Sequence, residues 1–150
     1  MEEKLISEYI GKDAQTFMNT NTNWVAALLG QSIGPVWFFY RKSYLLGFAF
    51  IIITLIIGRI TSALEISKAY YIMFFIYLFS ANKLYLWDVR RKVNKIMQTN
   101  ENMSQEEIVA IVRQKGGTNG LAAAIYVIII VALIAILYAM IYYLLHFFIS

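Results

Sequence analysis

Residues 121–148 contain no Asp, Glu, Lys or Arg, and this long apolar run limits what the chain can fold into. A helix needs about 20 apolar residues to cross the hydrocarbon core of a bilayer. The run is longer than that, so as a helix it must tilt or protrude. At 60% hydrophobic and 15% charged residues, the chain is also more apolar than a soluble domain. The sequence predicts an all-α integral membrane protein with three transmembrane helices, at about 44–60, 69–87 and 121–146.

The chain is predicted to divide near residue 43. Residues 1–43 form a cytoplasmic amphipathic and interfacial region, and residues 44–150 form the three-helix transmembrane domain. Apolar residues near the N-terminus recur at helical spacing, which predicts one or two short amphipathic turns on the membrane surface. Residues 24–29 are too few to cross alone, and residues 30–35 interrupt the helix with two glycines and the single proline. The N-terminal region 24–40 is therefore interfacial, a shallow re-entrant wedge, or the start of the first span.

A short cytoplasmic helix is predicted at about 104–115, between the second and third spans. Ser104 followed by Glu107 is a capping box, in which each side chain bonds the backbone of the other residue. Lys115 followed by Gly116-Gly117 is typical of a helix C-terminus. We expect the apolar face of this helix to lie on the membrane surface or against the cytoplasmic extension of the second span.

Lysine and arginine predict the orientation. They are frequent before residue 44 and between the second and third spans. They are few around the link 61–68, which joins the first two spans. Positively charged loops stay in the cytoplasm. We therefore expect a multi-pass protein of the bacterial cytoplasmic (inner) membrane, with its N-terminus inside and its C-terminus outside.

Several function classes lose support from the composition. The chain has no cysteine and one histidine, His146, which leaves no thiolate or histidine set for a metal. It shows no acid–base pair, Ser/His/Asp set or phosphate-binding glycine loop. We therefore expect no enzyme, no catalytic, cofactor-binding or metal residues, and no cofactor. The net charge of +4 lies in short blocks beside apolar runs, which indicates orientation and not a nucleic-acid partner.

Basic and aromatic side chains gather at the predicted cytoplasmic border, where they form a candidate contact surface for lipid or a partner. This collar consists of Trp37, Tyr40, Arg41, Lys42, Tyr44, Asn82, Lys83, Arg90, Arg91 and Lys92. One interpretation is binding of anionic lipid headgroups. The other is that the cations only set the topology. Asn82 and Lys83 also have two interpretations. One is a functional polar site within the membrane. The other is a structural role, in which the side chains snorkel to the interface and form hydrogen bonds between helices.

Two segments carry a family resemblance. Residues 23–30 are NWVAALLG, and residues 34–47 are GPVWFFYRKSYLLG. They resemble a family of small bacterial membrane proteins catalogued only as a domain of unknown function, marked by N-W-x-A-(apolar)-G-P-x-W-x-x-Y-R-K-x-Y. The resemblance implies a bacterial inner-membrane protein without known activity, and it implies no mechanism.

The leading functional hypothesis is a small non-enzymatic interaction or accessory protein. Its partners are the lipid bilayer, anionic lipid headgroups, and a membrane protein partner or a homo-oligomer. Small residues, namely Thr54 with Gly58 and a stripe including Ala132, Ala135 and Ala139, predict close packing of the spans. The alternative is a small transporter, channel or holin-like membrane-perturbing oligomer, because Thr54, Arg59, Asn82 and Lys83 lie near membrane depth.

Overall fold

The computed structural model describes residues 1–64 and 69–149, and these residues form helices and no strand. The all-α prediction is confirmed. The link between the first two predicted spans lies partly outside the described residues. The helices are α1 (Glu2–Ile10), α2 (Ala14–Asn19), α3 (Trp24–Ile33), α4 (Val36–Tyr40), α5 (Tyr44–Ala63), α6 (Ala69–Thr99), α7 (Gln105–Lys115) and α8 (Gly120–Ile149).

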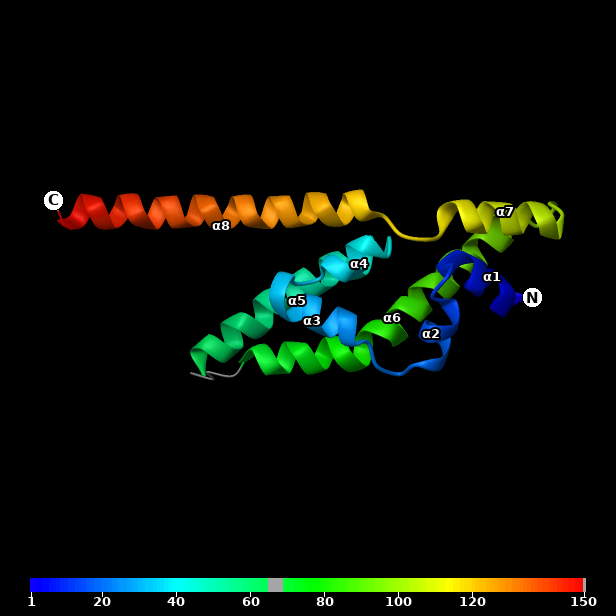
Figure 1. The fold of residues 1–150 in the computed structure, drawn as a ribbon, viewed down its shortest axis with the longest axis horizontal. Coiled ribbons are helices and arrows are strands. Elements are labelled where there is room, and N and C mark those ends of the chain that lie inside the picture. Colours follow the sequence, from blue (N-terminus) through cyan, green and yellow to red (C-terminus); the bar gives the residue numbers. More distant parts are fainter. Residues whose placement is uncertain (65–68, 150) are drawn as a thin grey trace.

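The helices separate into two ends of an elongated molecule (Figure 1). At one end lie α5, the first half of α6 and most of α8. At the other end α1, α2 and α7 surround the second half of α6. Two segments of the described chain are long and apolar enough to cross a membrane. One is α5, with a mean hydropathy of 2.1, and the other is Gln105–Tyr142, with a mean hydropathy of 3.0. The apolar part of the second segment is α8. That α6 also crosses the membrane stays a prediction.

The long helix α6 links the two ends. As predicted, it continues beyond Trp87 without a break. Apolar residues four positions apart place one face of it in the core, because residues at this spacing share a helix face. The fully buried members of this face are Tyr77, Ala81, Tyr85, Val89 and Val93. Helices α1, α2, α3, α5 and α7 all pack on α6, so it is the scaffold that positions the other elements.

The apolar face of α1 is buried in the protein and does not lie on a membrane surface as expected. Its side chains join the core with Val93 and Ile96 of α6 and Val112 of α7. The four buried residues of α1 are Leu5, Ile6, Tyr9 and Ile10. The face finds its partner on helices far away in the sequence, which the local pattern did not reveal. Of the two alternatives for α7, the structure shows packing against α1 and the extension of α6.

Helices α3 and α4 form a hairpin that folds back on itself. The predicted interruption at residues 30–35 is shorter than expected: α3 continues to Ile33, and the turn lies at Gly34, whose φ is 73°. The helix continues through Gly30. A side chain at this position would collide with the ring of Tyr77, so the glycine allows close packing of α3 on α6 and does not interrupt the helix. Tyr44 begins a separate helix, so residues 24–40 are not the start of the first span.

The hairpin runs into the apolar end and returns (Figure 1). Its end at Tyr40 accepts a hydrogen bond from the backbone N–H of Asn119, just before α8. Its turn at Gly34 lies beside the hydroxyl of Tyr126. Tyr126 comes seven residues after Asn119, which is about 10 Å along a helix axis. The hairpin therefore lies beside the first two turns of α8, and its placement in a membrane, interfacial or as a shallow re-entrant wedge, stays a prediction.

Helix α8 lies along one side and extends past the other helices (Figure 1). Its main contact is with α4, where the rings of Phe39 and Tyr126 stack 4.7 Å apart. Ala132, Ala135 and Ala139 are exposed, and a side chain at Gly58 would meet open space. The prediction that small-residue faces pack the spans together is therefore wrong within one copy of the chain.

Candidate functional site

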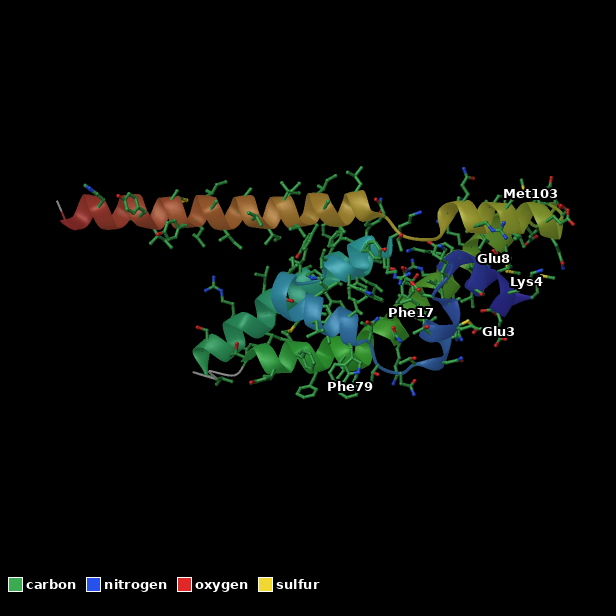
Figure 2. All side chains as sticks on the ribbon, viewed as in Figure 1. Glu3, Lys4, Glu8, Phe17, Phe79 and Met103 are labelled. Atoms are coloured by element: carbon green, nitrogen blue, oxygen red, sulfur yellow. The ribbon has the colours of Figure 1, made fainter. Side chains whose placement is uncertain are left out.

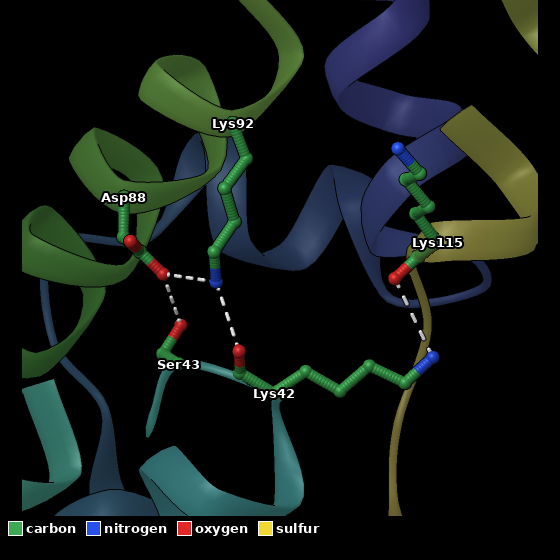
Figure 3. A network of polar contacts seen from close by, with 5 residues as sticks. All are labelled: Lys42, Ser43, Asp88, Lys92 and Lys115. Atoms are coloured by element: carbon green, nitrogen blue, oxygen red, sulfur yellow. Dashed lines mark hydrogen bonds and ion pairs between the residues drawn. The ribbon is translucent and has the colours of Figure 1, made fainter. Parts of the chain in front are cut away.

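A polar network joins the turn after α4 to α6 and α7 (Figure 3). Lys42 has a positive φ of 57°, which directs its carbonyl oxygen to α6, where it accepts a hydrogen bond from Lys92 Nζ at 2.8 Å. The Lys42 ammonium group points the other way and donates to the carbonyl oxygens of Lys115 and Gly116 at the C-terminus of α7. A cation is favoured there because the last carbonyls of a helix carry partial negative charge.

Asp88 is the buried acceptor of this network. Its carboxylate accepts hydrogen bonds from Ser43 Oγ and Lys92 Nζ, both at 2.6 Å. Spacing along the helix predicts a pair between Asp88 and either Arg91 or Lys92, and the structure forms the pair with Lys92. The two lysines of the collar that take part here, Lys42 and Lys92, therefore hold the fold together.

The turn after α7 packs tightly on α1. The backbone N–H of Gly117 donates to the Tyr9 carbonyl at 2.7 Å, and a Cβ on Gly116 would collide with the same carbonyl group. Burial raises the pKa of the Tyr9 phenol well above its usual value, so this side chain stays neutral. Glycine at 116 thus lets the α7 terminus pack directly on the backbone of α1.

Arg41 is the most enclosed cation of the collar. Its side chain is 7% exposed and lies 2.6 Å from Asp13 Oδ2. The guanidinium plane covers the ring of Phe17, with 4.5 Å to the ring centroid, a cation–π contact that desolvation strengthens. Arg41 Nε has no hydrogen-bond partner. Trp37 is buried nearby, with its ring 5.4 Å from that of Tyr85.

Asn82 joins the hairpin to α6. It is buried, accepts a hydrogen bond from Asn23 Nδ2 at 2.8 Å and donates to the Thr20 carbonyl at 2.8 Å. Asn23 Oδ1 also accepts from the backbone N–H of Ala26 and so caps α3. Of the alternatives for Asn82, hydrogen bonding between helices is the one that the structure shows.

Lys83, Arg90 and Arg91 are exposed on α6. The Arg91 guanidinium lies over the Trp87 ring, 5.8 Å from its centroid. Tyr40 and Tyr44 are partly exposed on the other side, and the Tyr44 hydroxyl accepts a hydrogen bond from Asn119 Nδ2 at 2.9 Å. The predicted collar therefore divides into an internal set that binds elements together, an exposed set on α6, and the two exposed tyrosines Tyr40 and Tyr44 at the ends of α4 and α5.

Sequence reasoning missed three partners of the internal set. Asp13 lies 28 positions from Arg41 and Ser43 lies 45 positions from Asp88, and no local pattern connects such pairs. Asn23 carried a signal as a residue favoured before the first turn of a helix. In the part of the chain that the structure describes, no group of three or more His, Cys, Asp or Glu residues could hold a metal ion.

The fold and these contacts define the class: an all-helical chain with two segments able to cross a membrane and a tightly bonded polar end. The family described as "Protein of unknown function (DUF2628)" matches residues 7–91, more than half of the chain, and the protein belongs to this family. The match contains the hairpin, the predicted collar to Arg91 and most of α6. No curated protein and no solved structure matches the chain.

Proposed function

We propose that this is a small non-enzymatic protein of the bacterial inner membrane that acts as an interaction or accessory component and holds anionic lipid headgroups at its cytoplasmic border. The contact surface is the exposed set on α6, namely Lys83, Arg90 and Arg91 with Trp87. Lys42 and Lys92 are left out, because their ammonium groups are bonded inside the protein.

The observation that carries this proposal is a stripe of residues four positions apart along α6. Phe75, Phe79 and Trp87 are each more than half exposed, and Lys83 and Arg91 are exposed between and after them. Figure 2 shows Phe79 pointing away from the body of the protein. Aromatic rings followed by cations are typical of the border between hydrocarbon and headgroups. Each cation near an anionic surface contributes about 1 kcal/mol.

The same stripe supports α6 as the second of three spans. Its aromatic part lies at the apolar end of the molecule, and its basic part lies toward α1 and α7. Lys4 and Glu8 lie at that polar end (Figure 2). We infer that this end is cytoplasmic, because positively charged segments stay there. The N-terminus is then inside, and the C-terminus of α8 is outside.

The proposal is tested by the lipids that copurify with the protein from membranes containing phosphatidylglycerol and phosphatidylethanolamine. Wild type should be enriched in phosphatidylglycerol, and the triple variant Lys83→Gln/Arg90→Gln/Arg91→Gln should lose most of that enrichment. The matched control changes three exposed lysines that lie outside α6, Lys4→Gln/Lys12→Gln/Lys115→Gln, and should keep it. Equal enrichment in the two triple variants would show that α6 is no headgroup site.

One observation favours the alternative, a holin-like membrane-perturbing oligomer. Every residue from 131 to 140 in α8 is exposed, so this apolar helix is available to further copies of the chain. Liposomes that contain the purified protein and a trapped dye test this alternative. Leakage that rises steeply with protein density would support it, and retention of the dye at all densities would dismiss it.

A further inference from the structure

We propose that the pocket between α2, α3 and α4 binds one fatty-acid molecule, with the hydrocarbon chain among the apolar side chains of the hairpin and the carboxylate at Arg41. The pocket has a volume of about 640 Å³, within the range of about 300–1,000 Å³ that small-molecule sites occupy. A pocket of this size takes a single chain and leaves no room for a two-chain phospholipid.

The wall that the hairpin supplies is apolar. It comes from both arms, and its members are Trp24, Val25, Leu29, Ile33, Val36 and Trp37. Trp24 and Val25 are each 60% exposed at the outer surface. Because the hairpin runs among the apolar helices, a chain can enter beside these two residues directly from the bilayer. This wall favours a saturated or monounsaturated hydrocarbon chain over a polar solute.

The polar end points to an anionic headgroup. Arg41 is the one cation, and Asp13 the one carboxylate, among the described residues that line the pocket. Asp13 binds one Nη nitrogen of Arg41, and Phe17 covers the face of the guanidinium group. The Nε–H group is buried and forms no hydrogen bond, and the Tyr85 hydroxyl, which lies near the same guanidinium group, is also buried without one. An unsatisfied buried donor is costly, and a carboxylate oxygen would satisfy it.

Two amides add further donors. Asn23 and Asn82 line the same pocket, and each uses one hydrogen of its NH2 group in the bonds to Asn82 Oδ1 and the Thr20 carbonyl. An amide NH2 group has two hydrogens, so one remains on each residue. An ionised carboxylate accepts hydrogen bonds and donates none. A cationic amphiphile would place a positive charge against the guanidinium group, so the site selects against it.

This inference goes beyond the proposed function, because it concerns a single chain inside the fold and uses none of the exposed cations of α6. The two proposals fail separately. The Lys83→Gln/Arg90→Gln/Arg91→Gln variant should still bind a fatty acid in detergent, and a variant with a filled pocket should still be enriched in phosphatidylglycerol.

The test is native mass spectrometry of the full chain released from a mild non-ionic detergent, titrated with hexadecanoate. Wild type should saturate with one bound hexadecanoate. Leu29→Trp fills the pocket and should weaken binding at least about tenfold, whereas Leu28→Trp, on the neighbouring exposed position of the same helix, should bind as wild type does. Arg41→Gln should weaken hexadecanoate binding about tenfold, the loss of one charge-assisted hydrogen bond, and leave hexadecanol binding unchanged.

Three results would overturn the proposal. They are adducts that never saturate, equal binding by Leu29→Trp and Leu28→Trp, and binding of hexadecyltrimethylammonium as tight as that of hexadecanoate. Arg41→Gln also removes the ion pair with Asp13 and can unfold the hairpin. The Leu29 and Leu28 pair tests the pocket without touching that ion pair.

Discussion

Asp88 carries the buried charge that joins α6 to the chain between α4 and α5. Replacement by alanine removes the acceptor of Ser43 Oγ and leaves Lys92 Nζ with the Lys42 carbonyl but without its carboxylate partner. Because an unsatisfied buried polar group is costly, Asp88→Ala should lower the free energy of unfolding by about 1–3 kcal/mol. Thermal unfolding in detergent measures this loss. Asn94→Ala, at an exposed position of the same helix, should stay within about 0.5 kcal/mol of wild type, and an equal loss in both variants would contradict the assignment.

Glu107 predicts an acid-sensitive helix start. Its carboxylate accepts hydrogen bonds from the backbone N–H and the hydroxyl of Ser104, both at 2.8 Å, and these bonds lower the pKa of Glu107. Because the pKa of Glu107 is lower in the folded state than in the unfolded state, the ionised carboxylate stabilises the fold at any pH above its ordinary pKa. This stabilisation is lost as the pH falls through the lowered pKa of the folded state. The first turn of α7 should therefore loosen only in acid, below the ordinary carboxyl pKa of about 4.3.

The Ser104→Ala variant checks the cause. It removes the hydroxyl donor and keeps the backbone donor, so an NMR titration should find the Glu107 pKa moved part of the way back toward its ordinary value. A Glu107 pKa that is ordinary in wild type would show that the capping box does not form in solution.

At the scale of the helices, local signals predicted most of the ends. The Ser104 capping box and Gly116 mark the limits of α7 as observed. The break before Val36 falls at Gly34, which follows the end of α3, and Pro35, which precedes α4. The sequence did not reveal which helices pack against one another. From its sequence, α1 resembles a helix that lies on a membrane surface. Its apolar residues have the same spacing whether the apolar face is covered by lipid or by α6 and α7. Such non-local burial needs the three-dimensional arrangement.

The site shows the same division between local and non-local information. The pair of Asp88 and Lys92 follows from their spacing on one helix. The enclosure of Arg41 by Asp13 and Phe17 does not, because these two residues lie at the start of α2 and within it, far from Arg41 in the sequence. A run such as Arg41-Lys42 at a membrane border looks like a free cationic surface in the sequence, yet both side chains are bonded to other elements.

Gly116 allows the close approach between α7 and α1. Its φ of −78° suits any residue, so the requirement is one of space. Gly116→Ala would push a methyl group into the Tyr9 carbonyl, and overpacking of this kind costs about 1–3 kcal/mol. Thermal unfolding should show the loss. Gly120→Ala, where a methyl group meets open space at the start of α8, should not lower stability. Wild-type stability in Gly116→Ala would contradict the observed contact.

For the whole molecule, the apolar runs were predictable and their packing was not. In the membrane position that we propose for α8, lipid tails are as apolar as leucine side chains, so no hydrophobic force would draw it onto the other helices. Its main contact with the body is with α4, near Tyr126. The polar end is different: α1, α2 and α7 bury apolar faces against α6, since these faces would otherwise meet water.

The central claim is that α6 crosses the membrane between an outer turn and a cytoplasmic polar end. The chain has no cysteine, so single introduced cysteines report without background. Ser62→Cys lies at the end of α5, and Met103→Cys lies between α6 and α7 at exposed positions. In intact bacterial cells, a membrane-impermeant maleimide should label Ser62→Cys, and it should label Met103→Cys only after the membrane is opened. Labelling of both cysteines from the same side would contradict the claim.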